Sequence, residues 1–254
     1  MRNKQLFYVV ILSWLLASHA GYAATTLVAV ASNFTKPMQE IATAFEKTTG
    51  HSANLSFGAS GKFVAQLENG APFEVFLSAD DKNPKKLEQD GFAVPGTQFT
   101  YALGKLVLWS ATPGLVDDQG AILGKGGFKH LALADPKLAP YGVAAVELLQ
   151  NQGLYDKLQP LMVQGENIAQ TQQFISTGNA ELGFLALSQV IDNGKIASGS
   201  GWIVPTGKHK PILQDAILLK TGAENPAATA FLKFLKSPEA IVIIRKYGYD
   251  LADK

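Results

Sequence analysis

Short apolar segments alternate with helical patterns along most of this chain, and this alternation restricts the fold more than any other feature. Residues 27–31, 53–57 and 73–78 are apolar or β-prone, and apolar residues at helical spacing follow the first two. Strands that are apolar throughout and separated by helices are typical of a parallel sheet covered on both faces. The first third of the chain therefore predicts an α/β lobe.

The same pattern returns further along the chain. Strands are predicted at residues 99–110 (with an interruption at Gly104), 131–134, 161–163, 181–187 and 216–219. Two helices should follow, because Asn225-Pro226 and Ser237-Pro238 each precede a run of helix formers. We predict that residues 24–104 and 213–254 form one lobe and residues 105–212 the other. A ligand cleft should then lie between the lobes.

The N-terminus has the organisation of a secretory signal. Arg2 and Lys4 precede an apolar run of about twelve residues (6–17), and small residues then lead to Ala23 and Ala24. The run is shorter than the roughly 20 residues of a membrane-spanning helix. We predict that residues 1–23 are a signal peptide cleaved after Ala23; an uncleaved anchor is the alternative.

Composition excludes several classes of function. The chain has 22 basic and 21 acidic residues, and removing Arg2 and Lys4 with the signal leaves 20 against 21. Without a basic cluster, we expect no nucleic-acid partner. There is no cysteine, which excludes disulfides, thiolate metal sites and a cysteine nucleophile.

Four junctions between a predicted strand and the next helix carry small, polar or hydroxyl-bearing residues. They are Ser32-Asn33, Ser60-Gly61, Tyr141-Gly142 and Asn167-Ile168. A helix N-terminus has free backbone N–H groups and the positive end of a dipole, so several of them aimed at one point would bind an anion without a cation. Ser32, Asn33, Ser60 and Tyr141 could add side-chain donors. Each residue alone is also compatible with ordinary helix capping or a tight turn.

Several segments resemble periplasmic molybdate-binding proteins. They are residues 30–34 (VASNF), 57–61 (FGASG), 69–80 (NGAPFEVFLSAD), 133–142, 181–184 (ELGF) and 231–248. The resemblance covers the chain after the signal. It implies a type II periplasmic-binding-protein fold, in which each lobe is a mostly parallel sheet flanked by helices. It also implies a periplasmic, monomeric carrier without a cofactor that delivers molybdate or tungstate to the membrane permease of an ABC importer.

The resemblance also implies which residues hold the ligand. The family's ligand positions fall on Ser32, Ser60, Tyr141 and Ile168, and in one branch also on Asn33. Ser32 and Ser60 would donate hydroxyl and backbone N–H groups, whereas Tyr141 and Ile168 would donate backbone N–H groups. Ser32, Ser60 and Ile168 would meet the metal only through the oxyanion oxygens. Some members place a tyrosine hydroxyl on the ligand where this chain has Ala186, so Asn33 is expected to compensate.

Other functions are alternatives to this one. A site built only of donors suits a fully ionised dianion, whereas protonated phosphate needs an acceptor for its proton. Asp80 and Asp135 lie near the junctions and could accept a proton, but we expect both to serve turns or caps. A carrier for sulfate or phosphate is one alternative. Another is an exported serine hydrolase using Ser60, which the sequence disfavours because no G-x-S-x-G elbow is present. The signal and the lack of a helix-turn-helix pattern disfavour a DNA-binding regulator.

Overall fold

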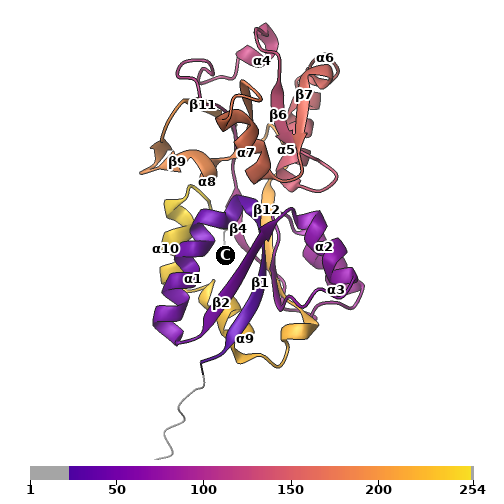
Figure 1. The fold of residues 1–254 in the computed structure, drawn as a ribbon, viewed down its shortest axis with the longest axis vertical. Coiled ribbons are helices and arrows are strands. Elements are labelled where there is room, and N and C mark those ends of the chain that lie inside the picture. Colours follow the sequence, from indigo (N-terminus) through magenta and orange to yellow (C-terminus); the bar gives the residue numbers. More distant parts are fainter. Residues whose placement is uncertain (1–22, 253–254) are drawn as a thin grey trace, which may run out of the picture.

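Two mixed sheets, each flanked by helices, form the two lobes of the molecule (Figure 1). The structure is a computed structural model and describes residues 23–252. The predicted signal, residues 1–23, lies outside the described residues except for Ala23. Across residues 23–252, none of the helices combines the length and apolar character that crossing a bilayer requires.

The first lobe, called lobe I below, contains both ends of the described chain. Its elements are β1 (Thr25–Ala31), η1 (Ser32–Phe34), α1 (Thr35–Thr49), β2 (Ser52–Gly58), α2 (Ser60–Glu68), β3 (Val75–Leu77), α3 (Lys82–Gln89), β4 (Phe99–Gly104), β12 (Ile212–Leu218), η3 (Lys220–Gly222), α9 (Pro226–Phe234) and α10 (Pro238–Lys246). Its strand order is β2-β1-β3-β12-β4, and β12 runs antiparallel to both of its neighbours.

The second lobe, lobe II, is formed by the middle of the chain. Its elements are β5 (Leu106–Ser110), α4 (Ile122–Lys125), β6 (Leu131–Ala134), α5 (Pro140–Asn151), α6 (Tyr155–Leu158), η2 (Gln159–Leu161), β7 (Met162–Gly165), α7 (Ile168–Ser176), β8 (Leu182–Ala186), α8 (Leu187–Val190), β9 (Ile191–Asp192), β10 (Lys195–Ile196) and β11 (Ser200–Ile203). The large sheet has the order β11-β5-β8-β6-β7, and β5 is antiparallel to both of its neighbours.

The predicted fold class is confirmed, with one refinement. In each sheet the antiparallel strand lies next to a crossing between the lobes: β5 follows β4 directly, and β12 follows β11. Both crossings therefore introduce a strand that opposes the rest of its sheet. The division at 104/105 and 212/213 stays a prediction; Ile212 is the first residue of β12, which belongs to the lobe I sheet.

The strand β1 shows why both faces of the lobe I sheet are covered. Val28 and Val30 face a core shared with α1, α9 and α10, whereas Ala29 faces a second core shared with α2 and α3. Successive side chains of a strand point to opposite faces, so an all-apolar strand needs helices on both sides. The apolar run at 27–31 had predicted this arrangement.

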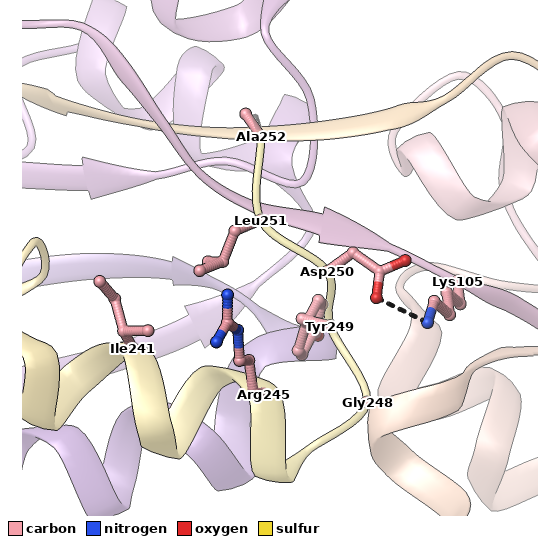
Figure 2. Close-up of a pocket in the computed structure, with 8 residues that line it drawn as sticks. All are labelled: Lys105, Ile241, Arg245, Gly248, Tyr249, Asp250, Leu251 and Ala252. Carbon is pink, nitrogen blue, oxygen red and sulfur yellow. Dashed lines mark hydrogen bonds and ion pairs between the residues drawn. The ribbon is translucent and has the colours of Figure 1, made fainter. Parts of the chain in front are cut away.

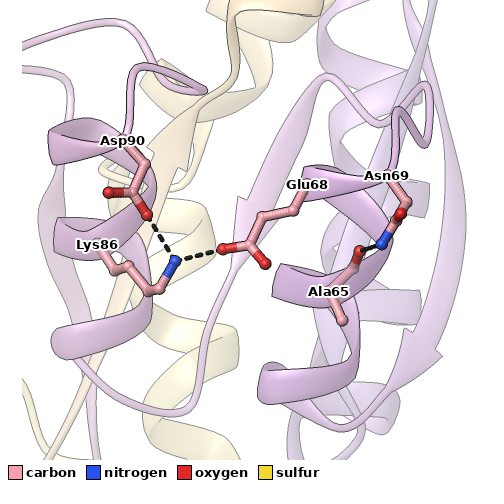
Figure 3. Close-up of polar contacts among 5 residues, drawn as sticks. All are labelled: Ala65, Glu68, Asn69, Lys86 and Asp90. Atoms are coloured by element: carbon pink, nitrogen blue, oxygen red, sulfur yellow. Dashed lines mark hydrogen bonds and ion pairs between the residues drawn. The ribbon is translucent and has the colours of Figure 1, made fainter.

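Helix α3 was not predicted, because five of its eight residues are Lys, Glu or Gln and only Pro84 and Leu87 are buried. It lies beside α2, to which Lys86 ties it by an ion pair with Glu68; Lys86 also bonds Asp90 at 2.5 Å (Figure 3). At the end of α2, the side chain of Asn69 donates to the carbonyl of Ala65 at 2.7 Å.

Candidate ligand-binding site

All five residues that the sequence predicts at the ligand line one small cavity between the lobes. The cavity is lined by Ala31, Ser32, Asn33, Gly58, Ala59, Ser60, Ala79, Ala139, Pro140, Tyr141, Asn167 and Ile168. Its volume of about 10 Å³ lies far below the roughly 300–1,000 Å³ of pockets for drug-sized ligands. The cavity therefore fits a guest of a few atoms.

The fold brings these residues together because each follows a strand at the same edge of its sheet. Ser32 follows β1 and Ser60 begins α2 after β2, and these two strands are parallel. Tyr141 lies in the first turn of α5 after β6, and Ile168 begins α7 after β7, again a parallel pair. The N-termini of α2, α5 and α7 thus meet at one point, where their dipoles favour a negative charge.

Glycine is required where α5 begins. A Cβ atom on Gly142 would lie 2.0 Å from the carbonyl oxygen of Ala134 in β6. Only a residue without a side chain allows the helix start to approach the strand this closely. Gly142 is therefore needed for packing, and this packing places Tyr141 at the cavity.

The five backbone N–H groups of the predicted ligand residues are unused. Among residues 23–252, none of the N–H groups of Ser32, Asn33, Ser60, Tyr141 and Ile168 has an acceptor. At α7 the cap explains this: the Asn167 side chain accepts from Ala169 and Gln170, at 3.0 and 3.1 Å, and leaves the N–H of Ile168 free. Buried N–H groups are seldom left unpaired, so such a set indicates a site for an acceptor.

The hydroxyl of Ser60 is oriented to donate. Ser60 is 1% exposed, and its Oγ accepts a hydrogen bond from the N–H of Ala79 at 3.0 Å. Because a hydroxyl has one proton, this bond leaves the Ser60 proton for another acceptor, and no described residue supplies one. Ser32 is 6% exposed, and its hydroxyl has no hydrogen-bond partner within residues 23–252. The cavity thus offers two hydroxyl donors.

The side chains of Asn33 and Tyr141 point away from this role. Asn33 Nδ2 donates to Gln214 Oε1 at 2.8 Å and to the Tyr249 hydroxyl at 2.9 Å, so both amide hydrogens are used. The Tyr141 hydroxyl accepts from Gln214 Nε2 at 3.2 Å. The expected side-chain donation from Asn33 is therefore not seen, and its backbone N–H is the group that it offers. Ala186 is buried and does not line the cavity.

The residues that line the cavity include no carboxylate, histidine, lysine or arginine. Asp80 accepts from Ser78 Oγ and from the Asn83 N–H, both at 2.9 Å, and burial raises the pKa of its carboxyl group. Asp135 Oδ1 accepts from the Lys137 N–H at 2.9 Å. The predicted turn and cap roles of both aspartates are confirmed.

Contacts between the lobes surround the cavity. The N–H of Gly61, next to Ser60, donates to the carbonyl of Leu138 at 2.9 Å. Lys62 pairs with Glu166 at 2.5 Å, and both side chains are about half exposed. Lys62 is thus neutralised by the opposite lobe rather than pointing at the guest, and the lobes lie closed at this edge of the cleft.

A larger hollow beside the C-terminal tail is lined by cationic residues, unlike the cavity between the lobes (Figure 2). Lys105 and Arg245 line it, but Lys105 is paired with Asp250 at 2.8 Å. The hollow has a volume of about 700 Å³, far larger than that of the cavity between the lobes. It does not enclose a small anion.

The comparisons with known proteins agree with this geometry. The model of the bacterial extracellular solute-binding protein family matches residues 26–250. The molybdate-binding protein ModA of Azotobacter vinelandii is 57% identical over 232 residues, which cover 91% of this chain and 92% of the relative. The ModA of Rhodobacter capsulatus is 57% identical over 227 residues, covering 89% and 88%. The chain belongs to the ModA family of bacterial extracellular solute-binding proteins.

Solved structures support the same assignment. The Azotobacter vinelandii periplasmic molybdate-binding protein superposes with a TM-score of 0.87 at 44% identity, covering 90% of this chain and all of that one. The predicted family is thereby confirmed. A sulfate-binding protein of Mycobacterium tuberculosis, SubI, has a TM-score of 0.72 at 16% identity, which shows a shared fold only.

Sequence reasoning missed Ala79, which lines the cavity and orients Ser60. A signal was available, because Ala79 follows the carboxyl end of β3 just as Ser32 follows β1. It also missed three residues behind the cavity: Gln214 bonds Asn33 and Tyr141, Tyr249 bonds Asn33, and Tyr101 bonds Gln214. Nothing in their local sequence predicts this position, because β4, β12 and the segment after α10 are far apart in the chain and meet only in the fold.

Proposed function

We propose that this ModA-family protein captures molybdate in the cavity between its lobes and delivers it to the membrane permease of an ABC importer. The observation that carries the proposal is the set of unused donors: five backbone N–H groups from both lobes and two hydroxyls from lobe I belong to residues that line one small cavity without a carboxylate. Molybdate is a tetrahedral dianion whose oxygens only accept hydrogen bonds. A cavity built of donors matches it without charge repulsion.

The names of the relatives support molybdate as the guest. Tungstate has the same charge and nearly the same shape, so we propose that it binds as well. The binding residues would be Ser32, Asn33, Ser60, Tyr141 and Ile168. Only the oxyanion oxygens would contact the protein, and the metal itself would receive no protein ligand. We propose that the carrier is a periplasmic monomer, exported by its predicted signal, that needs no cofactor and binds no nucleic acid.

The mechanism is a closure of the lobes rather than a reaction. The two crossings near Gly104 and Ile212 would act as hinges, and closure would bring the donors of lobe II onto an anion first held by lobe I. The serine hydrolase alternative lacks support, because no residue that lines the cavity could act as a base for Ser60.

Calorimetry of the purified chain without residues 1–23 tests the proposal. We expect tight one-to-one binding of molybdate and tungstate, and much weaker binding of sulfate and phosphate. Molybdate should also raise the melting temperature, because a ligand bound only by the folded state stabilises it. If millimolar molybdate produces neither heat nor a thermal shift, the proposed function is wrong; a preference for sulfate would favour the alternative carrier.

A further inference from the structure

A buried hydrogen-bond network lies directly behind the anion cavity, and its centre is Gln214 of β12. Gln214 is fully buried. Its Oε1 accepts from Asn33 Nδ2 at 2.8 Å and from the Tyr101 hydroxyl at 3.1 Å, and its Nε2 donates to the Tyr141 hydroxyl at 3.2 Å. A single amide therefore contacts two of the five residues at the cavity.

The network joins the two lobes. Gln214, Asn33 and Tyr101 belong to lobe I, whereas Tyr141 lies in the first turn of α5 of lobe II. A second hydrogen bond joins the lobes beside the bond between Gln214 and Tyr141: Ser188 Oγ of α8, in lobe II, donates to the Asn33 carbonyl at 2.8 Å. The Tyr249 hydroxyl, 2.9 Å from Ser188 Oγ, completes this side. The network can be whole only when the lobes are closed.

The network also lies at the crossings between the lobes. Gly104 at the end of β4 pairs with Ile212 at the start of β12. A Cβ atom on Gly104 would lie 2.3 Å from the Tyr141 hydroxyl oxygen and 2.7 Å from Gln214 Nε2. The phenol of Tyr141 therefore reaches the point where the two connecting segments run side by side, and Tyr141 also lines the cavity.

We propose that Gln214 is a positioning residue that couples closure of the lobes to anion binding, by holding the Tyr141 phenol and the Asn33 amide together across the cleft. The proposal deepens the proposed function and rests on it for the identity of the guest. Opening that moves Tyr141 away from Gln214 would break this bond between the lobes, and the loss disfavours the open form. An anion that binds the closed form shifts the same equilibrium.

The protonation states fit this role. Burial raises the pKa of Tyr101 and Tyr141 well above the ordinary value, and raises the pKa of Tyr249 to about 12. All three phenols therefore stay neutral. The network adds no negative charge behind the dianion.

The variant Tyr141→Phe tests the proposal, because it removes only the hydroxyl and keeps the backbone N–H at the cavity. Stopped-flow measurements should give a molybdate dissociation rate about 3- to 10-fold faster, as expected for one lost hydrogen bond. The association rate should change less than about twofold, because the open form that meets the anion lacks this bond. Tyr101→Phe is the matched control: it also loses a phenolic bond to Gln214, but within lobe I. It should lower the melting temperature without changing the dissociation rate.

The position of the lobes gives a second measurement. The chain has no cysteine, so spin labels at Lys47→Cys of lobe I and Lys125→Cys of lobe II, both exposed, report the distance between lobes. In the protein without ligand, Tyr141→Phe and Gln214→Met should both lengthen this distance or broaden it toward longer values, and Tyr101→Phe should not.

Two results would overturn the proposal. One is an equal change in dissociation rate for Tyr141→Phe and Tyr101→Phe, which would indicate a merely structural network. The other is an unchanged distance between the labels in both Tyr141→Phe and Gln214→Met. If the unaltered protein binds no molybdate, the proposed function fails, but the label distances still decide whether Gln214 couples the lobes.

Discussion

The two walls of the cavity offer the same kind of donor by different means. The wall of lobe I uses side chains as well as backbone, because Ser32 and Ser60 each add a hydroxyl to an N–H group. The wall of lobe II uses backbone alone: the Ile168 side chain packs in the core, and the Tyr141 phenol turns toward Gln214. Binding by the lobe I wall therefore depends on which side chains are present, whereas binding by the lobe II wall depends only on where the helices begin.

The largest effect should come from removing a backbone donor of lobe II. Ile168→Pro deletes one N–H group at the first position of α7, where proline is well tolerated. The preceding Asn167 already has the extended conformation (φ −145°, ψ 173°) that proline requires. We expect the affinity for molybdate to fall about 10- to 100-fold, because a buried anion loses a hydrogen bond. Calorimetry measures this change.

Ile168→Val is the matched control for that variant. It keeps the N–H group and removes one methylene from a side chain that is 3% exposed. The melting temperature should fall slightly, but the affinity should change less than about threefold. If Ile168→Val weakens binding as much as Ile168→Pro, the side chain rather than the backbone is responsible, and the contrast between the walls is lost.

A somewhat smaller effect is expected from the hydroxyl of Ser60 on the other wall. Ser60→Ala keeps the backbone N–H and removes one of two donors of that residue, so the affinity should fall about 10-fold. The N–H of Ala79 also loses its acceptor, and the melting temperature should therefore fall even without ligand. Ser56→Ala, an exposed serine of β2, should change neither quantity. Unchanged affinity of Ser60→Ala would remove Ser60 from the site.

The difference between the walls also explains what the sequence could predict. Ser32 and Ser60 were visible because a hydroxyl after a strand and before a helix is a recognisable signal. Ile168 has no such signal; its place depended on the helix start and on the family resemblance. Most strands were predicted because their apolar runs are local, although β12 begins at Ile212 rather than near 216, since its first residues pair with β4 across a long separation.

The roles of the side chains behind the cavity could not be predicted, for a physical reason. The local sequence predicts that the Asn33 side chain donates to the ligand beside Ser32. Its amide instead donates to Gln214 and Tyr249, which are 181 and 216 residues away. Local patterns give the direction of the backbone at a strand end. They do not say which distant polar group competes for a side chain.

The smallest expected effect is that of pH, because neither wall contains a group that titrates near neutrality. Among residues 23–252, Tyr141 is the only ionisable residue that lines the cavity, and burial raises its pKa well above 10.0. The affinity for molybdate should therefore change less than about twofold between pH 6.5 and 9, as calorimetry at each pH can show. Stability should behave differently: a raised phenol pKa favours the folded state below pH 10, and this contribution is lost as the pH rises toward the raised value. A tenfold change in affinity in the neutral range would mean that a titrating group touches the guest, as a carrier of a protonated anion would require.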